Sequence, residues 1–324
     1  MDRSHPARIS PATRPAPVPV GGGVPTERVV WRDGKLTPFA EATVHVLSHA
    51  ANRGSLVFDV LRVISLDEGP AAVGLRPHVS RFEQSMELMG MEPAVDVATL
   101  ELAVAAVVHA NPGAGLVKLV ATWDEIPPGP VPTMLTPTIT VIALDADDAV
   151  VTGPSVTATT AHMPKIPASI LPPSLKVAAG YAAAVRQQLA ARKAGYDEVI
   201  FAATDESLAE STTQSLLTVI DGRVVAPPLD IVLDGITRRL VLETAQHCGI
   251  PVEVRDVAMA EVATAPELML VSTTRFVRPL ARLDSRILDA PGPVARRLIT
   301  ALEAIVAGGH PLSARWVTPL PPIG

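Results

Sequence analysis

The lysine at position 176 is the side chain best suited to covalent chemistry. It stands among apolar residues in the segment LPPSLKVAAGY. The chain has five lysines, at 35, 118, 165, 176 and 193, so most of its positive charge is arginine, which keeps its proton. Burial disfavours a charged ammonium, and a neutral amine can attack a carbonyl carbon and hold it as a Schiff base. The simpler alternative is a lysine with a buried stem and its head in water.

Two further residues extend this chemistry. Tyr181, one of two tyrosines, lies five residues after Lys176, and Glu210 follows an alanine-rich helical run, a turn at Gly195 and the strand-like EVIFA. Pyridoxal 5'-phosphate needs an amine for its aldehyde, a phenol near its ring hydroxyl, a carboxylate beside its pyridine nitrogen and a cradle for its phosphate. Lys176, Tyr181 and Glu210 supply the first three of these groups.

A phosphate cradle is predicted from a helix start. Gly235 opens a helix after a polar turn, so the amides of Ile236 and Thr237 and the Thr237 hydroxyl face a possible anion. Ser272, Thr273 and Thr274 end an apolar strand and offer more donors. Ordinary helix capping and strand-end chemistry are the commoner explanation of such residues.

The chain resembles the fold type IV pyridoxal-phosphate enzymes, which include branched-chain aminotransferases, D-amino-acid aminotransferases and aminodeoxychorismate lyases. The resemblance runs from about Val29 to about Trp316, and besides the spacing of Lys176, Tyr181 and Glu210 it rests on five ordered segments. These are VHVLSHAANRGSLVFDVLR at 44–62, LRPHVSRF at 75–82, LDGITRRLVLE at 233–243, VSTTRFVRPL at 271–280 and PGPVARRL at 291–298. Each segment alone is a weak signal, but their order and intervals together are specific.

The resemblance implies a fold, an activity and a set of site residues. It implies an α/β (α+β) two-domain enzyme, an aminotransferase that moves an amino group between an amino acid or amine and a 2-oxo acid by a ping-pong Schiff-base mechanism. Lys176 would hold the cofactor, Tyr181 would meet its ring oxygen and Glu210 its pyridine nitrogen. The phosphate ligands would be Arg81, Ile236, Thr237 and Thr273, although the helix face of Arg81 by itself predicts a solvent position. Relatives of this kind are mostly homodimers, so a homodimer is expected.

The substrate pocket departs from the family pattern. Branched-chain aminotransferases have a tyrosine where Arg53 stands, and a tyrosine and an arginine in the strand that here reads Gly115 to Lys118. The candidate substrate residues are therefore Phe58, Arg53, Lys118 and Thr274. Two alternatives stay open: a lyase like the aminodeoxychorismate lyases, favoured by the GLVKLV strand, and a non-catalytic member of the fold, favoured by the altered pocket.

Composition excludes several other classes. A formal charge of −6 without any basic run argues against nucleic-acid binding, and no apolar run reaches the length of a membrane span. The single cysteine, Cys248, excludes an internal disulfide and lacks metal-ligand spacing. His45 and His49 lie four apart, but in a strand-like segment they would be too far apart to share a metal ion. We expect a cytoplasmic protein without a metal.

The chain divides into four predicted regions. Residues 1–26 are rich in Pro and Ala and predict a disordered tail. Residues 27–145 predict a small α/β domain, 146–156 a linker and 157–324 a larger cofactor-binding domain. Asp33-Gly34 and Asp221-Gly222 predict two hairpins. Helices are predicted from near Pro77, over ATLELAVAAVVHA, over 181–194, after Gly235 and over 293–307.

Overall fold

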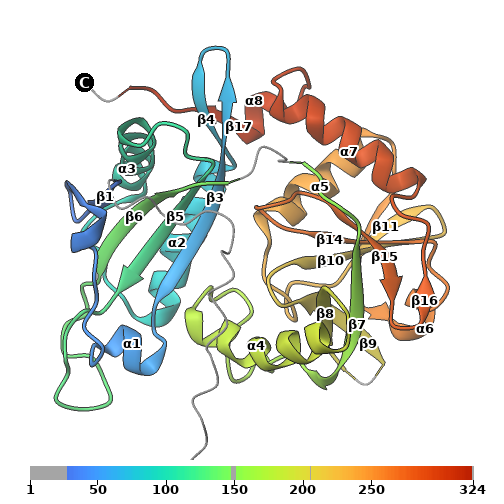
Figure 1. Ribbon diagram of the computed structural model, residues 1–324, viewed down its shortest axis with the longest axis horizontal. Helices are drawn as coiled ribbons and strands as arrows, with labels where there is room; N and C mark the ends of the chain where they lie inside the picture. The colour runs from blue at the N-terminus through green and yellow to red at the C-terminus, as the bar shows by residue number, and fades with distance from the viewer. Residues whose placement is uncertain (1–27, 147–150, 205, 323–324) are drawn as a thin grey trace, which may run out of the picture.

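The computed structural model describes residues 28–146, 151–204 and 206–322. Within these residues the strands form one seven-stranded and one ten-stranded sheet, which lie side by side with helices packed around them (Figure 1). The expected mixed α/β fold is therefore confirmed. The predicted tail at 1–26 lies outside the described residues, as does part of the predicted linker at 146–156.

The first sheet comes mostly from the first half of the chain. Its order is β17-β4-β3-β5-β6-β1-β2. Its members are β1 (Val29–Arg32), β2 (Lys35–Pro38), β3 (Val57–Leu66), β4 (Gly69–Val73), β5 (Leu116–Thr122), β6 (Thr138–Leu144) and β17 (Val317–Pro319). The predicted hairpin at Asp33-Gly34 joins β1 to β2, and both turn residues have positive φ (43° and 92°), as a tight two-residue hairpin turn requires.

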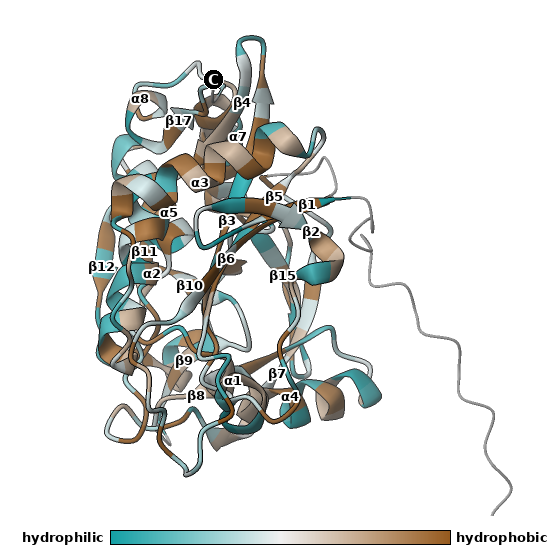
Figure 2. Ribbon diagram, turned by 90° about the vertical axis from the view of Figure 1, so that its left-hand side faces the viewer, coloured by the Kyte–Doolittle hydropathy of each residue, from teal (hydrophilic) through white to brown (hydrophobic). Residues whose placement is uncertain are grey.

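Two helices, α2 (Leu75–Met89) and α3 (Val97–Ala110), cover one face of this sheet. The short helices η1 (Phe39–Glu41) and α1 (His49–Arg53) lie in the connection between β2 and β3. Alternate β3 residues such as Val57 and Leu61 are buried with Val79, Phe82 and Met86 of α2 in one core. The other face of β3, which carries Phe58, is turned away from that core. Figure 2 shows β6 of this sheet coloured as apolar over most of its length.

The second sheet closes on itself. Its path runs β12-β11-β10-β14-β15-β7-β8-β9-β13, and a further pairing of Ser215 with Glu210 joins β10 to β9. Six strands, β10, β14, β15, β7, β8 and β9, therefore form a ring. The strands are β7 (Val156–Pro164), β8 (Glu198–Ala202), β9 (Ser207–Ser211), β10 (Ser215–Ile220), β11 (Arg223–Ala226), β12 (Val252–Val254), β13 (Val257–Ala258), β14 (Glu267–Val271), β15 (Arg278–Leu283) and β16 (Arg286–Ile287).

Helices on the outside of the ring complete the second core. They are α4 (Ala178–Lys193), α5 (Ile236–His247), α6 (Met259–Val262), α7 (Pro293–Val306) and α8 (Ser313–Trp316). α5 and α7 pack over β14, and their apolar faces share a core with it. α4 packs on β7 and β8 beside the first sheet (Figure 1).

The last strand belongs to the sheet built by the first half of the chain. β17 pairs antiparallel with β4, with Thr318 opposite Ala72. The predicted boundary assigned residues 157–324 to one domain, so it did not include the pairing of β17 with the first sheet. A division of the chain into two domains stays a proposal, with β17 added to the first.

The segment around His45 and His49 differs from the strand predicted there. His45 lies in a turn and His49 begins α1, where Ser48 caps the helix by accepting a bond from the amide of Ala51. The sequence alternates between apolar and polar residues as a strand would, but the Ser48 N-cap starts a helix here instead. Across the described residues, no group of three or more His, Cys, Asp or Glu side chains could hold a metal ion.

Candidate active site

A cavity of about 440 Å³ is lined by Arg81 of α2 and by strands, helices and loops around the second sheet. All seven residues predicted to bind the cofactor line this one cavity, although they come from segments far apart in sequence. They are Arg81, Lys176, Tyr181, Glu210, Ile236, Thr237 and Thr273. Their roles remain proposals, but a ligand in the cavity can contact them together.

The backbone at Lys176 is fixed by the first sheet. The amide of Phe58 donates to the Lys176 carbonyl at 3.1 Å, and the Lys176 amide donates to Ser85 Oγ of α2 at 3.1 Å. A bridge between Val57 and Val177 continues this pairing. The lysine therefore lies beside the first residues of β3, just before α4 begins at Ala178.

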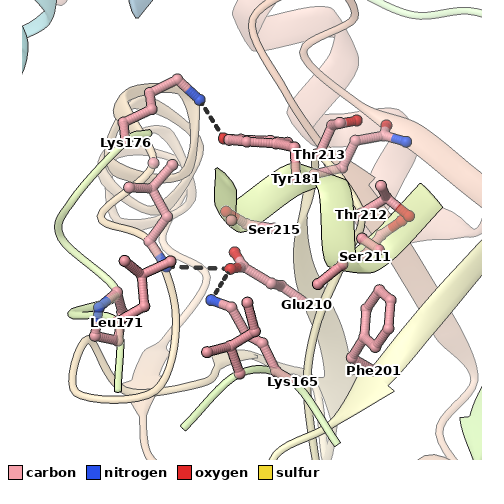
Figure 3. Close-up of a pocket in the computed structure, with 18 of the residues that line it drawn as sticks. Lys165, Leu171, Lys176, Tyr181, Phe201, Glu210, Ser211, Thr212, Thr213 and Ser215 are labelled. Atoms are coloured by element: carbon pink, nitrogen blue, oxygen red, sulfur yellow. Dashed lines mark hydrogen bonds and ion pairs between the residues drawn. The ribbon is translucent and has the colours of Figure 1, made fainter. Parts of the chain in front are cut away.

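The Lys176 side chain meets Tyr181 in the cavity. Its Nζ donates to the Tyr181 hydroxyl at 2.6 Å (Figure 3). The Phe58 ring supports both groups: Lys176 Nζ lies 4.8 Å from its centre, and the Phe58 and Tyr181 ring centres are 5.1 Å apart. The amine and the phenol, five residues apart in sequence, therefore form a hydrogen-bonded pair.

Glu210 stands at the pairing that closes the ring of strands. It is only 8% exposed, and one of its oxygens, Oε1, accepts bonds from Lys165 Nζ and, at 3.3 Å, from the Leu233 amide. In Figure 3 the Lys165 and Glu210 side chains point toward one another. Lys165 was not among the predicted site residues, because it lies 45 positions from Glu210 and shares no motif with it.

Arg81 is buried, which corrects the solvent position that its helix face predicts. Its Nε and Nη2 donate to the two carboxylate oxygens of Asp59 at 2.7 and 2.8 Å, and Nη1 donates to the Asp234 carbonyl at 2.8 Å. β3 and the loop before α5 cover this side of α2, so the guanidinium is enclosed. Asp59 and its second partner, His78, are site residues that the sequence analysis missed.

The charges around Asp59 are arranged to favour its ionised form. Burial alone would raise the pKa of this carboxyl, but the charges and hydrogen bonds of Arg81 and His78 outweigh burial and hold the pKa well below its usual value. Burial lowers the pKa of His78 despite its bond to Asp59. Burial alone would lower the pKa of Arg81, but the Asp59 carboxylate outweighs burial and raises it. A permanently charged pair therefore lies at this end of the cavity.

The start of α5 presents unused backbone donors. Its N-cap, Gly235, offers no side chain to cap the helix, and the amides of Ile236 and Thr237 have no acceptor within the helix. A Cβ at Gly235 would lie 2.8 Å from Ser215 Oγ, so the close approach of the loop to β10 favours glycine. Ile236 and Thr237 are 3% and 6% exposed. Since no acceptor in the described part of the chain bonds to their amides, these donors favour an anion here.

The four candidate substrate residues, Phe58, Arg53, Lys118 and Thr274, differ in their burial and in their contacts. Lys118 Nζ is 5.0 Å from the centre of the Phe58 ring, the same ring that contacts Lys176. Burial, and then the charge of Lys176, lower the pKa of Lys118. Arg53 is exposed at the end of α1 and Thr274 is exposed beyond β14. None of the four candidate substrate residues is among those that line the cavity.

A family comparison decides the class of protein. The model of the class IV aminotransferases matches residues 56–283. The chain belongs to this family. The matched residues contain Lys176, Tyr181, Glu210 and the start of α5, so the family match covers most of the cavity wall.

Individual members of this family are similar over almost the whole chain. The branched-chain-amino-acid aminotransferase of Pseudomonas aeruginosa is 26% identical over 303 residues, covering 90% of this chain and 96% of that protein. The branched-chain aminotransferase of Thermoproteus uzoniensis, solved with norvaline, has a TM-score of 0.85 at 26% identity over 91% of this chain and 99% of that one. The branched-chain amino acid aminotransferase of Thermobaculum terrenum, solved in its PLP-form, has a TM-score of 0.83 at 26% identity over 92% of this chain and 99% of that one.

Among the described residues of this class IV aminotransferase, none of the helices combines the length and the hydrophobicity that a membrane span requires.

Proposed function

We propose that this class IV aminotransferase uses pyridoxal 5'-phosphate to move an amino group from an aliphatic amino acid to a 2-oxo acid. The observation that carries the proposal is the 2.6 Å bond between Lys176 Nζ and Tyr181 in a cavity that also contains the Glu210 carboxylate and the open start of α5. Amino and 2-oxo acids are the substrates of the family. The aliphatic preference is supported by the relatives that act on branched-chain amino acids and by the apolar wall from Ile166 to Leu175.

The cavity residues fit this cofactor. The unpartnered amides of Ile236 and Thr237, with Arg81 beside them, would hold the phosphate, and Thr273 would add a hydroxyl. Asp59 occupies the Nε edge of Arg81 and leaves further N–H groups of the guanidinium for an anion. Glu210 would accept from the pyridine nitrogen. When bound, the cofactor supplies an aldehyde and an electron-withdrawing ring.

The protein side of the reaction follows from the geometry of three residues. Lys176 would hold the cofactor at its aldehyde and, once freed by the substrate amine, its Nζ would be the group that takes and returns the proton of the reaction. Tyr181 would donate to the ring oxygen, and its bond to Lys176 Nζ positions that amine in the cavity. Arg81 and the helix start would hold the phosphate and so limit the rotation of the cofactor.

Lys118 supports a carboxylate-bearing substrate. It is a partly buried cation near Lys176, and no acceptor in the described part of the chain hydrogen-bonds to it. The positive charges of Lys118 and Lys176 repel one another, and an incoming carboxylate would relieve that repulsion. We therefore place the substrate carboxylate beside Lys118, next to the Phe58 ring.

The visible absorption spectrum tests the proposal. Purified protein with pyridoxal 5'-phosphate should show a visible band that Lys176→Ala loses, because no other amine in the described part of the cavity bonds to Tyr181. Addition of an aliphatic L- or D-amino acid should bleach the band, and a 2-oxo acid should restore it. A matched variant, Lys193→Ala, removes an exposed lysine at the end of α4 and should behave as the wild type.

The same experiment separates the alternatives. Release of pyruvate without any 2-oxo acid acceptor would favour the lyase. A protein that stays colourless with excess cofactor would contradict the proposal and leave the non-catalytic alternative.

We also propose a homodimer. Two neighbouring loops expose apolar side chains, including Val46 (74%) and Val131 (68%). His49 joins the loops, since its Nε2 lies 3.2 Å from the Pro130 carbonyl oxygen and its amide donates to Glu125. An exposed apolar patch of this kind supports an interface with a second copy. The cytoplasmic location expected from the sequence stays a prediction.

A further inference from the structure

Lys165 is a cavity cation that neither the family motifs nor the proposed reaction uses. It follows directly on β7, and its amide donates to the Ala202 carbonyl at 3.0 Å. Its Nζ donates to Glu210 Oε1 and, at 3.2 Å, to the Ile231 carbonyl. One side chain therefore connects the end of β7, strand β9 and the loop that leads to α5.

The two carboxylate oxygens of Glu210 differ in their hydrogen bonds. Oε1 accepts from both Lys165 and the Leu233 amide, whereas Oε2 has no hydrogen-bond partner among the residues that the structure describes. The side chain is 11% exposed and lines the cavity. One oxygen is thus fixed by the protein and the other is left for a donor in the cavity.

Other cations of the cavity hydrogen-bond to groups other than Glu210, although the charge of Arg238 also interacts with this carboxylate. Arg81 bonds Asp59, Lys176 bonds Tyr181, and Arg238 bonds the Pro227 carbonyl at 2.9 Å. Among the described residues, Lys165 is the cation that hydrogen-bonds Glu210. Without it a nearly buried carboxylate would keep only the 3.3 Å bond from the Leu233 amide.

We propose that Lys165 is the positioning residue for Glu210, and that it holds Oε1 so that Oε2 accepts from the pyridine nitrogen of the cofactor. This inference rests on the proposed function, since it assumes pyridoxal 5'-phosphate in the cavity. Lys165 acts through Glu210 and does not itself contact the ring.

The test compares two ligands that differ at one ring position. The first is pyridoxal 5'-phosphate, and the second is its analogue with C–H in place of the pyridine nitrogen. Dissociation constants are measured by absorbance titration of cofactor-free wild type, Lys165→Met, Glu210→Gln and the double variant. Lys165→Arg keeps the charge, and Lys193→Met is the matched control at an exposed lysine.

We expect Lys165→Met to weaken pyridoxal 5'-phosphate binding roughly 10- to 100-fold, the range for loss of a hydrogen bond to a charged group. Its affinity for the analogue should not change, because the analogue offers Glu210 no N–H. The double variant should bind no more weakly than Glu210→Gln alone. Lys165→Arg should recover most of the affinity, and Lys193→Met should match the wild type.

A purely structural ion pair gives a different pattern. Equal weakening of both ligands, or additive effects in the double variant, would overturn the inference, as would unchanged cofactor binding by Lys165→Met. If Lys165→Met does not fold, Lys165→Gln keeps a donor for Ile231 and takes its place. Absence of cofactor binding by the wild type would instead reject the proposed function and, with it, this role.

Discussion

At the scale of single residues, Asp59 has the strongest electrostatic role. Its side chain is fully buried, and it pairs with an arginine that is 7% exposed. Asp59→Asn keeps the shape but removes the charge, which leaves a buried guanidinium without a counter-ion. Loss of one partner from such a pair costs about 3–5 kcal/mol. We expect that decrease in the free energy of unfolding, measured by urea denaturation, together with weaker binding of the cofactor phosphate through Arg81.

The pH dependence of this loss has a definite sign. The folded pKa of Asp59 is depressed, so its stabilising effect is complete above the unfolded value of about 3.9 and is lost as the pH falls below it. The difference between wild type and Asp59→Asn should therefore be constant near neutral pH and shrink in acid. Asp67→Asn, at an exposed turn of the same hairpin, is the control. A difference that persists undiminished in strong acid would contradict this account.

The sequence analysis predicted Lys176 and Tyr181 as site residues but missed Lys165 and Asp59, although Asp59 lies in the family-like segment 44–62. Lys176 and Tyr181 were recognisable because α4 starts between them and brings them together locally. Asp59 and Lys165 act on partners 22 and 45 positions away, so only the folded chain brings each pair into contact. The burial of Arg81 was mispredicted for the same reason, since β3 and the Asp234 loop cover a helix face that its own sequence marks as polar.

At the scale of secondary-structure elements, α7 depends on a cap from another strand. Its N-cap is Gly292, which has no side chain, and Glu267 of β14 accepts from the amides of Val294 (2.9 Å) and Ala295 (2.8 Å) instead. Glu267→Gln turns one acceptor into a donor that faces an N–H group. We expect a loss of about 1–3 kcal/mol in the free energy of unfolding, measured by thermal or urea denaturation.

Glu303→Gln is the matched control, because Glu303 is exposed on the same helix. Both variants should keep the visible cofactor band, since neither residue lines the cavity. Equal stability of Glu267→Gln and wild type would mean that the cap contributes nothing.

The elements themselves were predicted unevenly. The predicted hairpins at Asp33-Gly34 and Asp221-Gly222 are confirmed. Both residues of each turn have positive φ, a conformation that Asp-Gly sequences favour. The main helices were correct within a few residues. β9, which carries Glu210, was not predicted as a strand. Its pairing with β8 and its closing contact with β10 depend on the ring, and five residues alone give little pattern.

At the scale of the whole molecule, we expect two chains to associate through the loops around Val46 and Val131. Replacing both with glutamate should place charge at the interface and shift the mass measured by light scattering from dimer to monomer. Ile287→Glu is the control, because Ile287 is 82% exposed on β16, away from these loops. A wild type that is monomeric at all concentrations tested would contradict the dimer, and a dimer unaffected by the double change would contradict this interface.

The pairing of β17 with β4 was beyond reach of the sequence, since the two strands lie more than 240 positions apart. It also has a consequence for synthesis. On the ribosome, the amino-terminal half can form β1 to β6 early, but the edge of β4 stays unpaired until residues 317–319 leave the exit tunnel. An unpaired edge is open to the strands of other nascent chains. The seven-stranded sheet is therefore completed only after residues 317–319 have left the tunnel, long after its other strands are made.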